Sequence, residues 1–106
     1  MPSAPPANVH VQLVGLSSIT VKWDPVPRGS RNGFVKGYRV RYRQTFSNGT
    51  DGEIKTLSTM WLVTEANLTE LKMASIYKIE VAGVSWAGTG VYSEAVTAQT
   101  RKFKTV

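Results

Sequence analysis

Short runs of alternating apolar and polar residues, interrupted by glycine, proline and asparagine, are the feature that most constrains this chain. The clearest is YRVRYR at residues 38–43, where tyrosine and valine alternate with arginine. A period of two places successive side chains on opposite faces of a β-strand, and no segment shows the period of a helix. Further strands are expected at residues 9–13, 19–23, 54–57, 61–68, 77–81 and 91–100. About seven short strands predict an all-β fold, a seven-stranded, two-sheet immunoglobulin-like β-sandwich.

One domain accounts for nearly the whole chain. With 106 residues and 42% hydrophobic content, the chain can bury a single two-layer core. We expect residues 1–6 to be a proline-rich linker, residues 7–100 the domain, and residues 101–106 a basic C-terminal linker. In the first strand of the domain Val9, Val11 and Leu13 are expected to share one face.

The charge balance narrows the range of partners. Thirteen lysines and arginines against seven aspartates and glutamates give a net charge of +6. Because the basic residues are dispersed, the pattern argues against nucleic acid and favours an acidic polysaccharide, an anionic lipid face or an acidic protein. No apolar run approaches the roughly 18 residues of a membrane helix, so we expect no membrane insertion of this fragment. The N-terminal residues do not have the basic-then-apolar pattern of a secretory leader, so if the protein is secreted we expect this chain to be a fragment of it.

Nothing in the sequence favours catalysis. The absence of cysteine excludes a disulfide, a thiolate zinc site and a cysteine nucleophile. The one histidine, His10, is expected on the outward face of the first strand, and the acidic residues are scattered singly. Acid–base and nucleophilic catalysis both need groups within hydrogen-bond reach of each other. We therefore expect no enzyme, no metal site and no cofactor.

A tyrosine in LKMASIYKIEV, residues 71–81, indicates how the two sheets are joined. A connection that crosses between sheets leaves backbone groups without ladder partners, and each costs about 1–3 kcal/mol if buried unpaired. Tyr77, six residues after Leu71, can pack its ring on the core while its hydroxyl bonds a backbone group a few residues upstream. This arrangement is a tyrosine corner. Trp23, on the second strand, is expected to be the other anchor between the sheets.

In order and spacing, five segments together resemble a fibronectin type III domain over about residues 5 to 100. They are PPANV, ITVKWDPV with Trp23, RNGFVKGYRVRY with Tyr38, LTELKMASIY with Leu71 and Tyr77, and VAGVSWAGTGVYS. Met73, where the family often has proline, and Trp86, where a small polar residue is usual, depart from the pattern. The expected core residues are Trp23, Tyr38, Val40, Leu68, Leu71, Tyr77, Ile79 and Val81.

The strongest candidate contact face is an arginine ladder. Arg39, Arg41 and Arg43 project from one face of a strand at about 7 Å intervals. They could bind a sulfated glycosaminoglycan such as heparan sulfate, or an acidic protein. The alternative is cross-strand pairing with Glu80 and ordinary solvation, which contributes about 0–1 kcal/mol per pair.

The loops offer a second set of candidates. Trp86 lies in the connection between the last two strands, which in the resembling family is a frequent contact loop. It could anchor a partner or fold back over the sheet edge. Arg28 and Arg31 lie in the 28–33 loop. The integrin-binding tripeptide Arg-Gly-Asp is absent, since WAGT occupies the relevant loop.

Two glycosylation sequons are present, Asn48-Gly49-Thr50 and Asn67-Leu68-Thr69. Asn48 is expected at a hairpin tip, and Asn67 is out of phase with the core residue Leu68. Both side chains should therefore be exposed, which favours an extracellular location.

The resemblance implies a non-enzymatic interaction and spacer module in the extracellular part of a multidomain cell-surface adhesion molecule or receptor. Such modules occur in neural adhesion proteins and receptor tyrosine phosphatases. The expected partners are neighbouring domains of the same chain and a protein ligand or co-receptor. Two alternatives keep the fold: an intracellular module of a giant muscle-filament protein, and a dedicated heparin-binding copy.

Overall fold

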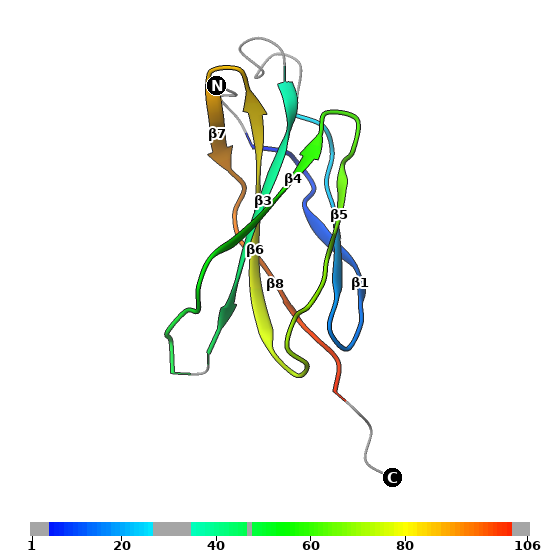
Figure 1. The fold of residues 1–106 in the computed structure, drawn as a ribbon, viewed down its shortest axis with the longest axis vertical. Coiled ribbons are helices and arrows are strands. Elements are labelled where there is room, and N and C mark those ends of the chain that lie inside the picture. Colours follow the sequence, from blue (N-terminus) through cyan, green and yellow to red (C-terminus); the bar gives the residue numbers. More distant parts are fainter. Residues whose placement is uncertain (1–4, 27–34, 47, 103–106) are drawn as a thin grey trace.

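A computed structural model describes residues 5–26, 35–46 and 48–102. Two antiparallel sheets pack face to face, and the described residues contain no helix (Figure 1). The smaller sheet has the order β1-β2-β5, formed by β1 (His10–Val14), β2 (Ile19–Lys22) and β5 (Glu65–Leu68). The larger has the order β4-β3-β6-β7, formed by β3 (Val35–Thr45), β4 (Lys55–Met60), β6 (Ile76–Ser85) and β7 (Gly88–Tyr92), with β8 (Val96–Gln99) also paired to β6. The predicted all-β sandwich is confirmed.

The core lies between the sheets and is built from the inward positions of the alternating runs. All eight residues expected in the core are buried. Ile19, Val21 and Val26, which were not among those eight, belong to the same buried cluster. The Trp23 indole meets the Tyr38 ring edge-on, with centroids 5.6 Å apart. Edge-to-face pairs of this kind contribute about 0.5–1.5 kcal/mol beyond the area they bury.

The tyrosine corner is present at the end of the sandwich where β6 begins. The Tyr77 hydroxyl accepts a hydrogen bond from the Lys72 backbone N–H at 2.9 Å, five residues upstream. The opposite side of the connection is held by Thr100, whose hydroxyl accepts from Ser75 N–H at 3.0 Å and donates to the Lys72 carbonyl at 2.6 Å. The N–H groups of Lys72 and Ser75 and the Lys72 carbonyl are therefore paired by side chains where no neighbouring strand is available.

Two expectations about the strands need correction here, and a third concerns the last strand. Leu13 does not share a face with Val9 and Val11: it is 65% exposed, because a bulge between Val11 and Leu13 shifts the β1–β2 register. The expected strand at 61–68 is shorter, since β5 begins at Glu65 and residues 61–64 form the turn that follows β4.

The last strand is split, which raises the strand number from seven to eight. β7 and β8 both pair with β6, on either side of Ser93. The Ser93 hydroxyl accepts from Val81 N–H at 3.0 Å, and Ser93 N–H donates to the Val81 carbonyl at 2.8 Å. The Ser93 hydroxyl thus replaces a backbone acceptor of the sheet at the point where the strand is interrupted.

Gly37 allows β3 and β4 to approach closely at the end where β3 begins. A Cβ atom there would clash with the Thr59 carbonyl oxygen. Gly37 pairs with Met60 on one side and with Val84 on the other.

No helix in the described ranges is long and apolar enough to cross a membrane.

Candidate interaction surface

The outer face of β3 carries the arginine ladder, and its central member is neutralised. Arg41 binds Glu80 through two hydrogen bonds, Nε to Oε1 at 3.1 Å and Nη2 to Oε2 at 3.0 Å. Its guanidinium also lies 3.8 Å from the centroid of the Tyr92 ring. The hydrogen bonds that Arg41 donates to the Glu80 carboxylate raise the pKa of Arg41 above its ordinary value. This is the cross-strand pairing that the sequence offered as the alternative to ligand binding.

The last member of the ladder is also paired with an acid. Arg43 Nε lies 3.5 Å from an Asp51 carboxylate oxygen, and Lys78 Nζ lies 3.3 Å from the same oxygen. The pKa of Asp51 is lowered, first by a hydrogen bond from the Thr45 side chain and then by Lys78. At this end of the face one carboxylate is shared between two cations.

Arg39 differs from its two neighbours. It is partly buried and, within the described part of the chain, makes no hydrogen bond and no salt bridge. All acidic side chains of the chain lie in the described ranges, at positions 24, 51, 53, 65, 70, 80 and 94. None of them forms an ion pair with Arg39.

A hollow of about 250 Å³ lies beside Arg39, where β3 begins and β4 ends. Its lining includes Lys36, Gly37, Arg39, Met60 and Val84. Gly37 has no side chain and lies between Met60 and Val84 in adjacent strands. Gly37 is buried and the Thr59 carbonyl oxygen fills the position that a Cβ would take, so Met60 and Val84 are the apolar side chains that line the hollow.

Trp86 lies beside the same end of the sheet. It belongs to the tight turn from β6 to β7, and 80% of the residue is exposed. Lys36 Nζ lies 4.7 Å from its ring centroid, a cation–π contact that ties the turn to the start of β3. Of the two arrangements considered for this tryptophan, the structure has the exposed one.

The last residue of β4 and the turn after it are apolar and exposed. Met60, Trp61, Leu62 and Val63 are 73%, 46%, 73% and 44% exposed. Val63 N–H donates to the Met60 carbonyl at 2.8 Å, and the Thr59 hydroxyl donates to the Val63 carbonyl at 2.9 Å. This turn and the β6–β7 turn with Trp86 are both at the upper end of the molecule in Figure 1.

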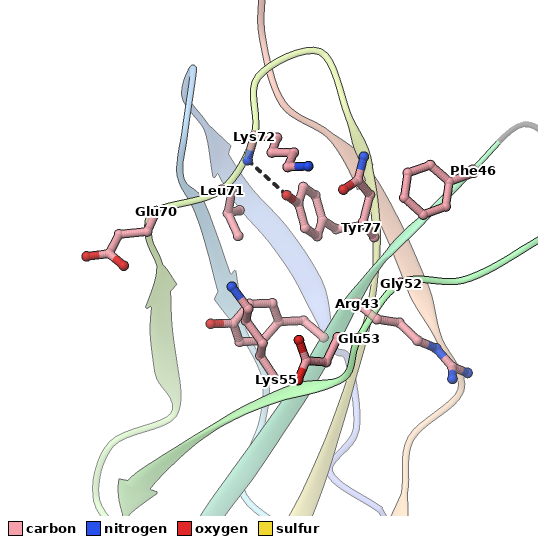
Figure 2. A pocket seen from close by; sticks show the side chains of 11 residues that line it. Arg43, Phe46, Gly52, Glu53, Lys55, Glu70, Leu71, Lys72 and Tyr77 are labelled. Atoms are coloured by element: carbon pink, nitrogen blue, oxygen red, sulfur yellow. Dashed lines mark hydrogen bonds between the residues drawn. The ribbon is translucent and has the colours of Figure 1, made fainter.

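A second hollow, of about 290 Å³, lies near the tyrosine corner at the other end of the sandwich. Figure 2 shows Leu71 and Tyr77 beside it, with the Tyr77 hydroxyl already bonded to Lys72. Its charged lining residues have both signs: Arg43, Lys55, Lys72, Glu53 and Glu70. This mixture favours no anionic or cationic ligand.

The two sequons are exposed. Asn48 lies at the β3–β4 hairpin, where its Oδ1 accepts from the Thr50 N–H at 3.1 Å and the Thr50 hydroxyl at 2.6 Å. Asn67 is on the outer face of β5, and its Oδ1 accepts from the Thr20 hydroxyl at 3.2 Å. Arg28 and Arg31 lie outside the described residues. Among those described, no three histidine, aspartate or glutamate side chains gather into a metal site.

Comparison with known proteins decides the family. The family model for the fibronectin type III domain matches residues 4–99. The chain is a fibronectin type III domain. The solution structure of the third fibronectin III domain of the human KIAA0343 protein superposes with a TM-score of 0.86 at 31% identity, covering 99% of this chain and 87% of that one.

Among curated proteins, this fibronectin type III domain is 39% identical over 102 residues to the netrin receptor DCC of Homo sapiens, covering 94% of this chain. It is 33% identical over 102 residues to the cell adhesion molecule DSCAM of Homo sapiens, covering 96% of this chain. The domain spans 7% of the first relative and 5% of the second. Both are much longer proteins.

Sequence reasoning identified Trp86 and the ladder but did not single out Met60 and Val84. The sequence did not indicate these two residues, because the register of β4, β3 and β6 decides which side chains line a hollow between the three strands. The run MWLV at residues 60–63 breaks the alternation and was a usable clue to an exposed apolar turn.

Proposed function

We propose that this fibronectin type III domain is a non-catalytic interaction and spacer module in the extracellular part of a multidomain adhesion molecule or receptor. The observation that carries the proposal is the match to a netrin receptor and a cell adhesion molecule over 94% and 96% of the chain. Because the domain covers only a small part of each, its partner does not follow from theirs.

The shape supports a spacer role. Residues 5–9 lie toward one end of the long axis, and residues 100–102 lie at the other (Figure 1). Consecutive domains joined at such ends form a string, with the β4–β5 and β6–β7 turns beside one junction. Neighbouring domains of the same chain are therefore the first partners we propose, and a protein ligand or co-receptor the second.

The exposed sequons support an extracellular location. Asn48 and Asn67 are both accessible, as the attachment of a glycan requires. We propose that both are glycosylated in the native protein.

Heparan sulfate is a second candidate ligand, favoured by the net charge of +6. It is the weaker one, because Arg41 and Arg43 each lie beside a carboxylate. A heparin column tests it: if Arg39→Gln elutes at the same salt concentration as the unaltered domain, the outer face of β3 does not bind the polysaccharide.

The location is tested in cells that make the whole native protein, with an antibody against this domain. We expect staining of intact cells and a loss of apparent mass on enzymatic deglycosylation, reduced in Asn48→Gln and Asn67→Gln variants. Staining only after permeabilisation, with no mass change, would refute the proposal and favour the intracellular filament module.

A further inference from the structure

We propose that the hollow at the start of β3 binds an extended segment of a partner protein that carries an aspartate or glutamate next to an apolar residue. We name this hollow, lined by Lys36, Gly37, Arg39, Met60 and Val84, the β3 groove. The inference rests on the proposed function as an interaction module and adds to it the place and chemistry of the contact.

The carboxylate requirement comes from Arg39. A guanidinium presents five N–H donors in a fixed fork that matches the two oxygens of a carboxylate. Arg41 has such a partner in Glu80, whereas Arg39 has none among the seven acidic residues of the chain. Because Arg39 is partly buried against the groove, a carboxylate from another molecule would supply what the chain itself lacks.

A second cation lies at the same groove. Lys36 has no salt bridge within the described residues, and its ammonium lies over the Trp86 ring. This contact keeps a positive charge and an 80% exposed indole together at one edge of the groove. Tryptophan and arginine are the residue types that most often dominate binding energy at protein interfaces.

The apolar residue of the proposed segment is required by the row of residues Met60, Gly37 and Val84, which are paired across three strands. Met60 and Val84 flank Gly37, one strand away on each side, which separates their backbones by about 10 Å. Both line the groove, and an apolar side chain of the partner segment can contact them there. Methionine adapts to ligands of different shape, and Met60 is 73% exposed.

This composition favours a peptide over a sulfated polysaccharide. A polysaccharide needs a row of available cations, but next to the groove the ladder continues with the Arg41–Glu80 and Arg43–Asp51 pairs. Sulfate groups also gain nothing from Met60 and Val84. The cations Arg39 and Lys36 lie beside the apolar residues of the β3 groove, and this combination matches a short segment with an acidic and an apolar residue.

The test is an NMR titration of the ¹⁵N-labelled 106-residue chain with three capped hexapeptides. In these peptides valine alternates with glutamate, glutamine or lysine. We expect the glutamate peptide to shift the amides of residues 36–39, 58–60 and 84–86, and to bind about tenfold more tightly than the glutamine peptide. The lysine peptide should not bind.

Two variants locate the effect. Arg39→Gln should weaken the glutamate peptide about tenfold, whereas Arg43→Gln, which removes the same charge from the same face, should change its dissociation constant less than about twofold. Dispersed amide spectra of both variants establish that they are folded.

Three results would overturn the proposal. They are equal weakening by the two variants, equal binding of the glutamate and glutamine peptides, and tighter binding of a heparin tetrasaccharide to the same amides. None of these results bears on whether the domain is displayed outside the cell, so the groove can fail while the proposed location stands.

Discussion

Replacing Tyr77 with phenylalanine removes one hydroxyl group, whose role in the structure is specific. That hydroxyl accepts the Lys72 N–H at 2.9 Å, and the tyrosine is only 6% exposed. Phenylalanine keeps the ring and its packing but leaves the amide without its acceptor. A buried donor left unpaired costs about 1–3 kcal/mol, and because the Lys72 side chain is exposed, water can reach part of this site. We expect Tyr77→Phe to lower the free energy of unfolding by about 1–2 kcal/mol.

Urea unfolding followed by tryptophan fluorescence measures this loss. For a domain of this size the free energy falls by about 1.5 kcal/mol per molar urea, so the midpoint should drop by about 0.7–1.3 M. The slope should not change, since the variant exposes the same surface on unfolding.

Tyr42→Phe is the matched control. Tyr42 also lines the hollow of Figure 2, but its hydroxyl makes no hydrogen bond within the described part of the chain. Its loss should change stability by no more than about 0.5 kcal/mol. If the two variants unfold at the same urea concentration, the hydrogen bond does not stabilise the fold and the role assigned to the tyrosine corner is wrong.

Three further predictions follow from single side chains. Trp23→Ala should lower the free energy of unfolding by about 3–5 kcal/mol, but Trp23→Phe by less than half of that, and urea midpoints compare the two. The buried indole N–H has no hydrogen-bond partner among the residues that the structure describes, so its removal offsets part of the lost packing. Gly37→Ala should destabilise by about 1–3 kcal/mol through its clash with Thr59, whereas Gly52→Ala, whose Cβ would lie 3.4 Å from its nearest neighbour, should cost less in thermal melts. Since the pKa of Asp51 is lower in the folded state, the Thr45 hydrogen bond and the ion pairs of its carboxylate stabilise the fold above the unfolded value of about 3.8, and this stability is lost as pH falls through the folded pKa. Asp51→Asn should flatten the profile of stability against pH below about pH 4, and an unchanged slope there would contradict the shift.

The strands and the core were predictable because they depend on local pattern. Period-two alternation identified β2, β3 and β6, and Tyr77 identified the crossing between the sheets. The position of Leu13 was not predictable in this way. A bulge inserts one residue without any mark in the alternation, and every side chain after it then changes face.

Little in the sequence indicated that the last strand is split into β7 and β8. Ser93 is small and polar, as many loop residues are, and only its contact with Val81 across the sheet shows that it replaces a ladder bond. Contacts between residues 12 positions apart depend on how β6 and β7 are paired. The pairing in turn depends on the whole sheet.

The arginine ladder shows why net charge alone does not locate a binding face. Arg39, Arg41 and Arg43 are equivalent in sequence, since each follows an apolar residue on one strand. In the sheet, Arg41 is opposite Glu80, Arg43 is opposite Lys78 and reaches Asp51, and Arg39 is opposite Ala82. The register therefore places Glu80 of β6 opposite Arg41 and lets Asp51 of the β3–β4 hairpin reach Arg43, but it places no acidic side chain beside Arg39. Because Arg39 lines the β3 groove together with Met60 and Val84, the electrostatic and the apolar parts of the proposed contact come from the same pairing of three strands.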